Sequence, residues 1–234
     1  MNAHSIPLAG RGSTTRVLAP AEIEGLLVEM LAALPCDGKR VLVIVPDATR
    51  SAPMPLLFRV LCEQLAARTR ALDYLIALGT HPPMSEPAIA RWIGMTAAER
   101  AERFPEVRVS NHRWDDPGAL RTIGTISASE TARLTDGLLA HEVPVRLNRL
   151  VDDYDLLLLC GPVFPHEVAG FSGGAKYLFP GISGAEIIDF THWLGALSTS
   201  MATIGVRDTP VRRIIHRAAE LVVHEVRCLT LALE

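Results

Sequence analysis

The sequence has few cysteines and no long apolar run. No apolar stretch approaches the roughly 20 residues that a membrane-spanning helix requires, and residues 1–16 lack the apolar core of a signal peptide. We therefore expect a soluble, cytoplasmic protein. The cysteines stand far apart and never in CxxC spacing, which favours buried thiols in a reducing compartment over a zinc site or a disulfide framework. They are Cys36, Cys62, Cys160 and Cys228.

An excess of charge of one sign is also missing. Lys and Arg number 23 against 26 Asp and Glu, a formal net charge of -3, so nothing indicates a nucleic-acid or membrane-surface partner. Apolar residues make up 49% and charged residues 21% of the chain, which excludes disorder as its main state. The 234 residues suit one large domain. We expect residues 1–16 to be a mobile lead-in and residues 17–234 to form a single α/β domain.

Short apolar runs alternate with segments of helical spacing. Residues 40–46 form an apolar run bounded by Arg40 and Pro46 and rich in β-branched side chains, as is typical of a strand buried on both faces in a parallel sheet. Residues 72–78 and 154–160 show a similar pattern. The alternation predicts an α/β fold with an open, mostly parallel sheet flanked by helices, a Rossmann-like arrangement. The other expected elements are helices at 53–68, from 85, at 96–103, 185–197 and 210–222, and strands at 107–110, 122–127 and 226–234, with no boundaries assigned between 128 and 150.

A polar cluster follows each of the three clear strands. Residues 47–50 (Asp-Ala-Thr-Arg) follow the first and residues 79–81 (Gly-Thr-His) the second, whereas the third is followed by His166 and by residues 170–176 (Gly-Phe-Ser-Gly-Gly-Ala-Lys). Parallel strands end at one edge of their sheet, where open α/β folds bind ligands. We therefore expect two histidines, a lysine, an aspartate and an arginine to converge on one crevice at the carboxyl edge of the strands.

Each of these residues also has a purely structural interpretation. Asp47 and Arg50 can pair with each other or cap the next helix, whereas a free Arg50 suits a carboxylate or phosphate. His81 and His166, in tight loops at strand ends, suit structural hydrogen bonds as well as acid–base chemistry.

Residues 170–176 differ from the phosphate loop GxxxxGK[ST], because Ala175 stands where that motif needs glycine and Tyr177 where it needs Ser or Thr. Their glycines can aim backbone N–H groups at an anion or simply form a turn that exposes Lys176. His192 lies on a predicted helix, where a histidine is more often structural than a ligand.

Together these segments resemble the lactate racemase family of nickel-pincer-nucleotide enzymes. Residues 165–181 (PHEVAGFSGGAKYLFPG) resemble the family signature PHxxAG[YF]SGGxKxxxPG, residues 47–50 resemble its DxTR element, and residues 79–81 its GTH element. The three occur in the family's order, and His192 stands sixteen residues after Lys176, where the family has its nickel-binding histidine. The resemblance runs from about residue 40 to the end and covers the family's N-terminal domain. We expect the smaller C-terminal domain to be absent from this chain through truncation.

The resemblance implies racemisation or epimerisation of a lactate-like 2-hydroxy acid. The reaction would be a hydride shuttle with a nickel pincer nucleotide, a pyridinium mononucleotide whose two sulfur arms hold nickel. Lys176 would carry this cofactor covalently, and His192 would bind the metal. His81 and His166 would be the catalytic acid–base pair on opposite faces of the substrate.

The remaining implied roles concern binding. Arg50 would hold the substrate carboxylate, and Asp47 would contact the cofactor or orient its neighbours. The backbone of Ser172, Gly173 and Gly174 would contact the nucleotide phosphate.

The implied partners are a small 2-hydroxy acid and the enzymes that build and load the cofactor, without which the protein would be empty. Pro82 replaces an arginine of many relatives, and the DxTR element continues as Ser-Ala-Pro, so the substrate and the oligomeric state stay open. Two alternatives remain: a non-catalytic α/β module that binds a nucleotide or a phosphorylated metabolite, and a metal-free α/β enzyme that uses the crevice for acid–base chemistry.

Overall fold

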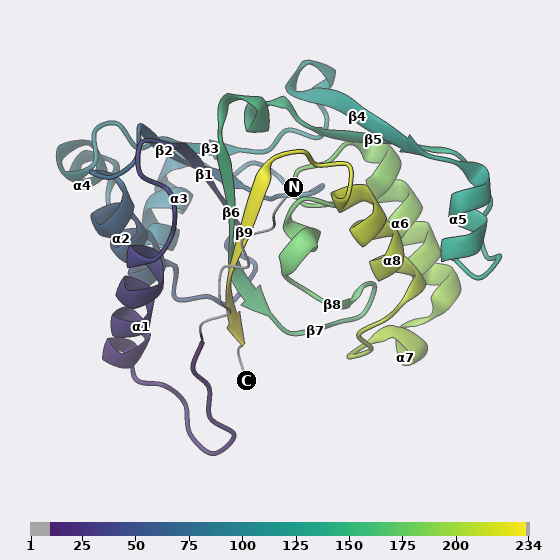
Figure 1. Cartoon of the computed structure of the whole chain (residues 1–234), viewed down its shortest axis with the longest axis horizontal. Helices are drawn as coiled ribbons and strands as arrows, with labels where there is room; N and C mark the ends of the chain where they lie inside the picture. The colour runs from purple at the N-terminus through teal and green to yellow at the C-terminus, as the bar shows by residue number, and fades with distance from the viewer. Residues whose placement is uncertain (1–9, 233–234) are drawn as a thin grey trace.

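A five-stranded parallel sheet forms the centre of the protein in the computed structural model, which describes residues 10–232 (Figure 1). All four neighbouring pairs of strands are parallel. The prediction of an open, mostly parallel α/β sheet is therefore confirmed. Its strand order is β3 (Val109–Asn111), β2 (Ala71–Ile76), β1 (Arg40–Val45), β6 (Leu156–Val163) and β9 (Glu225–Ala232).

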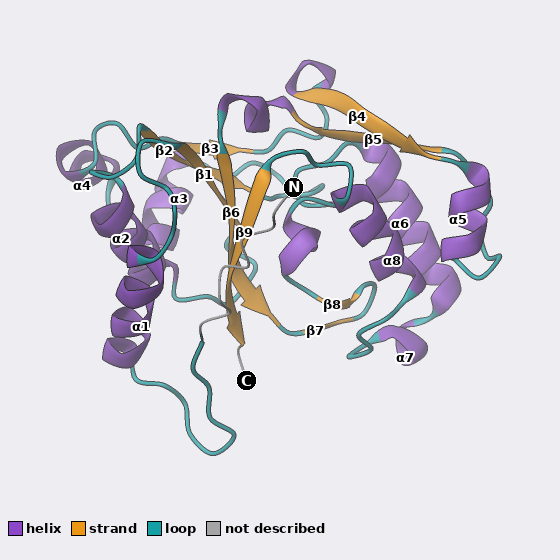
Figure 2. Cartoon of the chain, viewed as in Figure 1, coloured by secondary structure: helices purple, strands orange, loops and turns teal. Residues whose placement is uncertain are grey.

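Helices cover both faces of this sheet (Figure 2). One face carries α1 (Pro20–Ala32), α2 (Met54–Leu65) and α3 (Glu86–Ile93), with the short α4 (Ala97–Arg103) beside α3. The other face carries α6 (Ala185–Ser198), α8 (Pro210–Ala219) and a two-stranded antiparallel sheet of β4 (Leu120–Ile126) and β5 (Val143–Asn148). The smaller elements are α5 (Ala128–Leu134), α7 (Ser200–Thr203), β7 (Pro165–His166), β8 (Gly170–Phe171), and the 3-10 helices Pro117–Ala119, Arg149–Asp153 and Gly174–Tyr177.

The continuous apolar pattern of the strands follows from this layering. In β1, Val41, Val43 and Val45 pack into the core under α1–α3, whereas Leu42 and Ile44 pack into the core under α6 and α8. Successive side chains of a strand point to opposite faces, so a strand covered on both faces needs an apolar residue at every position.

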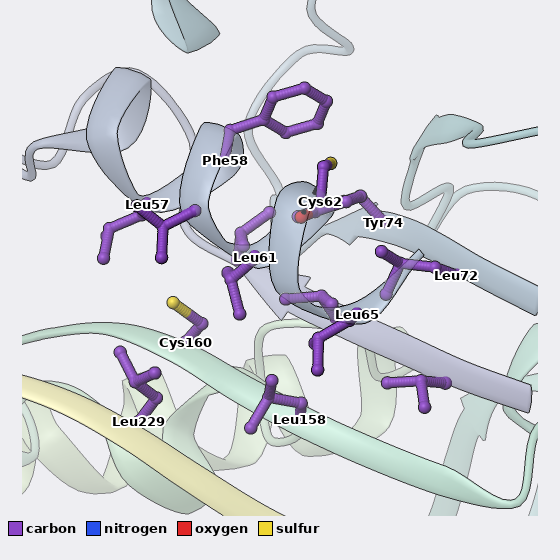
Figure 3. Packing of buried hydrophobic residues seen from close by; sticks show 14 of the residues in the cluster. Leu57, Phe58, Leu61, Cys62, Leu65, Leu72, Tyr74, Leu158, Cys160 and Leu229 are labelled. Atoms are coloured by element: carbon purple, nitrogen blue, oxygen red, sulfur yellow. Dashed lines mark hydrogen bonds between the residues drawn. The ribbon is translucent and has the colours of Figure 1, made fainter. Parts of the chain in front are cut away.

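Helix α2 shows how one core is filled (Figure 3). Leu57, Phe58, Leu61 and Leu65 recur at helical spacing and are fully buried against the sheet. Each such side chain contributes about 1.5–3 kcal/mol on leaving water. This packing fixes the sheet whose carboxyl edge carries the polar clusters.

The direction in which successive strands are added to the sheet reverses between β1 and β6. From β1 it proceeds to β2 and β3 on one side, whereas from β6 it proceeds to β9 on the other. The loops after β1 and β6 therefore leave in opposite directions and open a crevice at the carboxyl ends of these strands, the place where doubly wound folds bind ligands.

Several local predictions are confirmed and others are wrong. The helix expected at 96–103 is α4, and it begins with a capping box, since Thr96 and Glu99 each bond the other's backbone N–H. The strand expected at 122–127 exists as β4, but it pairs with β5 outside the main sheet. The patterns of β5 and α1 were not recognised in the sequence.

Two sequence predictions concern the ends of the described region. Of the lead-in expected at 1–16, residues 1–9 lie outside the described residues, and residues 10–16 form no helix or strand. The strand expected at 226–234 is β9, and residues 233–234 also lie outside. Cys228 is exposed, contrary to the prediction of buried thiols, because β9 is an edge strand without full cover. No helix within residues 10–232 is both long and apolar enough to cross a bilayer.

Candidate active site

A cavity of about 100 Å³ lies at the crevice between β1 and β6. Loops after β1, β2 and β6 supply most of its walls, and helix α6 supplies one histidine. Seven of the nine predicted site residues line it; His166 and Gly174 do not. The seven are Asp47, Arg50, His81, Ser172, Gly173, Lys176 and His192.

Asp47 is buried and holds His81 in one orientation. One carboxylate oxygen accepts hydrogen bonds from the backbone N–H (3.1 Å) and hydroxyl (2.6 Å) of Thr49, and the other lies 2.5 Å from Nδ1 of His81. Burial raises the pKa of the carboxyl, but the bonds from Thr49 and His81 outweigh it and leave the pKa below its ordinary value. Because the carboxylate is ionised, Nδ1 of His81 carries the proton of this hydrogen bond, and in the neutral ring Nε2 is the nitrogen with the lone pair.

One structural interpretation of the sequence pairs Arg50 with Asp47. The structure does not contain this pair. The Arg50 guanidinium lies 5.9 Å from the ring centre of Phe164, and it forms no ion pair within residues 10–232. A half-buried guanidinium beside an aromatic ring, with its fork of N–H donors free, suits a carboxylate ligand.

Lys176 contributes an amine that is enclosed by the site. Burial and, to a smaller extent, the positive charges of Arg50 and Arg212 lower its pKa from 10.5 to about 8, against the opposing negative charge of Glu167. A substantial fraction of the amine is therefore neutral near pH 8, the form that acts as a nucleophile.

The loop before Lys176 has a conformation that requires glycine. Gly173 has φ 73° and ψ -178°, and a Cβ there would lie 2.4 Å from a methyl carbon of Val163. The hydroxyl of Ser172 accepts a bond from the N–H of Phe164 (2.9 Å) and so ties the loop to the end of β6. These contacts shape the loop; the phosphate contact expected of Ser172, Gly173 and Gly174 stays a prediction.

Arg212, which the sequence analysis did not single out, supports this loop from α8. Its side chain is buried, and its guanidinium donates to the carbonyl groups of Phe171 and Gly173. The sequence signal was an arginine between Val211 and Ile214 on the apolar face of an amphipathic helix.

His166 belongs to a small hairpin, in which β7 pairs with β8. Its Nδ1 accepts hydrogen bonds from the backbone N–H groups of Val168 (3.0 Å) and Ala169 (3.3 Å). Burial and the positive charge of Lys176 lower its pKa to about 4. His166 is therefore neutral at pH 7 and carries its proton on Nε2.

In His192 the donor and acceptor nitrogens are exchanged relative to His166. Nδ1 of His192 lies 2.7 Å from the carbonyl oxygen of Ile188, one turn earlier in α6, so Nδ1 is the donor and Nε2 has the lone pair. Histidines that bind metals are commonly fixed in this way, by a hydrogen bond from the second ring nitrogen to a carbonyl. Within residues 10–232, no three His, Cys, Asp or Glu side chains are grouped to hold a metal ion by themselves.

Fold and site define the class: a doubly wound α/β domain whose switch-point crevice is lined by two histidines, an enclosed lysine amine and an arginine without an ion-pair partner among the described residues. The chain belongs to the lactate racemase family, since residues 26–205 match the family described as the lactate racemase N-terminal domain.

The sequence relatives agree with this assignment. The chain is 28% identical to the lactate racemase of Thermoanaerobacterium thermosaccharolyticum over 79% of its own length and 40% of the relative's. It is 27% identical to that of Lactiplantibacillus plantarum over 66% and 33%, respectively. The chain thus spans well under half the length of these curated relatives.

Two crystal structures are similar in fold. A Thermotoga maritima protein matches 93% of this chain and 52% of its own with a TM-score of 0.81 at 32% identity. The lactate racemase apoprotein of Thermoanaerobacterium thermosaccharolyticum matches 88% of this chain and 45% of its own with a TM-score of 0.66 at 23% identity, which supports the fold alone.

Proposed function

We propose that this chain is the cofactor- and substrate-binding domain of a racemase or epimerase of a lactate-like 2-hydroxy acid, which works with a lysine-tethered nickel pincer nucleotide. The observation that carries the proposal is the convergence of Lys176, His192, His81 and Arg50 on one cavity. The relatives are named lactate racemase, and the chain covers less than half of them, so the activity of the whole protein is part of the proposal.

The side chains fit the proposed cofactor. Lys176 would hold it covalently, because its partly neutral amine can be acylated. His192 would bind nickel through Nε2, whose lone pair is left free by the hydrogen bond from Nδ1 to Ile188. A single imidazole would supply one ligand, and the remaining donors would have to come from the cofactor itself.

When bound, the cofactor supplies a reversible acceptor for the hydride on the α-carbon of the substrate. The chain supplies the rest of the chemistry. Arg50 binds the substrate carboxylate and fixes the α-carbon, and His81 takes the hydroxyl proton on Nε2, with Asp47 orienting the ring. His166 would be the second acid–base group; it does not line the cavity, but it lies near the charges of Lys176 and Arg50.

The decisive test is the intact mass of the 234-residue chain, with nickel analysis, after co-expression with the cofactor-building enzymes. We expect a nucleotide-sized adduct and bound nickel in the wild type. Lys176→Ala should lack both, and His192→Ala should keep the adduct but lose most of the nickel.

Lys39 provides the matched control. It is the only other lysine of the sequence, and it pairs with Glu225 at 2.6 Å. Lys39→Ala should load like the wild type. An adduct that persists in Lys176→Ala would refute the proposal, and a folded wild type that binds a free nucleotide without an adduct would favour the non-catalytic module.

A further inference from the structure

The cavity at the crevice contains more positive than negative charge. Arg50 and Lys176 both line it. Among the described lining residues only Asp47 is acidic, and its two carboxylate oxygens are already bonded to Thr49 and His81. No carboxylate of the cavity wall is therefore left for the two cations, and an anion is the ligand that this cavity favours.

The amine of Lys176 is free to react with such a ligand. Its Nζ forms no hydrogen bond or ion pair within residues 10–232, and it is not among the fully buried unpaired atoms of these residues, so it is accessible from the cavity. Burial and the nearby cations lower its pKa to about 8. A desolvated lysine beside another cation is the kind of amine that forms a Schiff base with a carbonyl compound.

Arg50 lies close enough to Lys176 to bind the same ligand. Its positive charge acts on the amine, both residues line the cavity, and its guanidinium has no ion-pair partner within residues 10–232. A guanidinium binds a carboxylate through two parallel N–H bonds. A ligand that satisfies both residues has a carboxylate for Arg50 and, directly attached to it, an electrophilic carbon for Lys176.

We propose that Lys176, in the chain without a bound cofactor, forms a Schiff base with a small 2-keto acid whose carboxylate is bound by Arg50. The cavity of about 100 Å³ is about three times the volume that one water occupies in the liquid, which fits an acid as small as pyruvate. This reaction requires no cofactor and is independent of the proposed function.

The atoms and protons of the condensation balance. The neutral amine attacks the keto carbon, an N–C bond forms, the C=O double bond opens, and a proton moves from nitrogen to oxygen to give a carbinolamine. The C–O bond then breaks, the hydroxyl takes up a proton and leaves as water, and a C=N double bond forms. In sum, the ammonium form of Lys176 and the 2-keto acid give a protonated imine and water, without an oxidant or a reductant.

His81 is placed to carry the proton between these steps. It lines the same cavity, its Nδ1 lies 2.5 Å from the carboxylate of Asp47, and its Nε2 has no hydrogen-bond partner within residues 10–232. Nε2 takes the proton that the ammonium group must lose before attack and returns it to the departing hydroxyl. The Asp47 carboxylate stabilises the imidazolium that exists between the two transfers.

Under the proposed function, a 2-keto acid and the cofactor would compete for one amine. The Schiff base occupies the nitrogen of Lys176, so a chain in this state would not accept the cofactor. Hydrolysis of the imine releases the acid and restores the amine, so the occupation is reversible.

The test is reductive trapping of the unloaded chain with pyruvate and cyanoborohydride, which reduces the imine to a stable secondary amine. Mass spectrometry of the lysine peptides locates the carboxyethyl group and separates it from the α-amino group of the chain, which also reacts near neutral pH. We expect labelling at Lys176, and none at this position in Lys176→Ala.

Lys39 in the same molecule is the matched control, since it pairs with Glu225 at 2.6 Å and does not line the cavity. Lys176 should be labelled at least about 100-fold faster than Lys39, because a pKa of about 8 leaves far more neutral amine than an unperturbed lysine has. This comparison within the wild type decides the test even where a variant does not fold.

Acetaldehyde, which has the carbonyl but no carboxylate, tests the part of Arg50. The ratio of Lys176 labelling by pyruvate to labelling by acetaldehyde should fall at least about tenfold in Arg50→Gln, since a hydrogen-bonded charge pair is lost. The ratio cancels any change in the reactivity of the amine itself when the charge of Arg50 is removed.

Equal labelling of Lys176 and Lys39 in the folded wild type, or an unchanged ratio in a folded Arg50→Gln, would overturn the Schiff base. No trapping by pyruvate together with a nucleotide adduct at Lys176 after co-expression would also overturn it and would leave the proposed function standing. Trapping by pyruvate without any adduct after co-expression would support the Schiff base and count against the proposed function.

Discussion

The amine of Lys176 should react with acylating reagents at a pH at which an ordinary lysine is inert. Burial and the charges of Arg50 and Arg212 bring its pKa from 10.5 to about 8. At pH 7 about 9% of the amine is then neutral, against about 0.03% for an unperturbed lysine, so the reactive form is about 300-fold more abundant.

The assay is competitive acetylation of the unloaded chain across pH 6–11, read by mass spectrometry of the peptides that contain each lysine. Lys39 in the same molecule is the reference amine, since it lies outside the site in an ion pair with Glu225. Labelling of Lys176 should reach half of its maximum near pH 8. Arg212→Gln should move this midpoint upward, because one of the repelling charges is lost.

Two results would refute this reasoning. One is a Lys176 midpoint at or above pH 10 in the folded wild type, which would mean that the amine is solvated and ordinary. The other is an unchanged midpoint in Arg212→Gln, provided that circular dichroism and thermal unfolding show a folded variant; it would mean that the guanidinium does not act on the amine.

The remaining predictions concern the loop, the core and pH. Gly173→Ala should destabilise the fold by about 2–4 kcal/mol, since a side chain is strained at this backbone conformation and meets Val163. Gly174→Ala, at a position with φ 57° and open space around it, should cost only about 1–2 kcal/mol. Equal free-energy costs of the two variants in urea unfolding would contradict the packing argument. Leu61→Ala should lower the free energy of unfolding by about 2–5 kcal/mol, because the Leu61 side chain of α2 is fully buried against the sheet. A substitution at the exposed Val28 (37% exposed) should change this free energy by less than about 0.5 kcal/mol. Burial lowers the pKa of His112 from 6.5 to about 4, so between these pH values the unfolded chain binds a proton at His112 that the native chain does not. The free energy of unfolding should therefore fall between pH 6.5 and pH 4, by up to about 3 kcal/mol. Chemical denaturation at several pH values measures this dependence, and His112→Gln should weaken it.

Most of the sheet could be predicted because its signal is local. The run from Val41 to Val45 is apolar at every position, and only a strand buried on both faces needs that pattern. The helices α2 and α8 could likewise be predicted, because their apolar residues recur at helical spacing. Helix α1 was missed, although it begins with Pro20 and carries Glu22 in its first turn, because only Leu27 and Leu31 are buried and its apolar face is narrow.

The pairing of strands could not be predicted from such local patterns. β4 has a recognisable strand composition, yet nothing in its own residues says that it pairs with β5 rather than joining the main sheet. Strand pairing depends on contacts between residues that are distant in sequence, and a local pattern does not encode them.

The sequence by itself determined the alternating α/β order, the polar clusters at three strand ends and the family motifs, because each of these is written within a few consecutive residues. Only the tertiary structure decided that Asp47 bonds His81 rather than Arg50, that Arg212 lies behind the glycine loop, and that the two site histidines carry their protons on opposite nitrogens. Those features depend on which groups the fold brings within hydrogen-bond distance, and on how much water and charge remain around them.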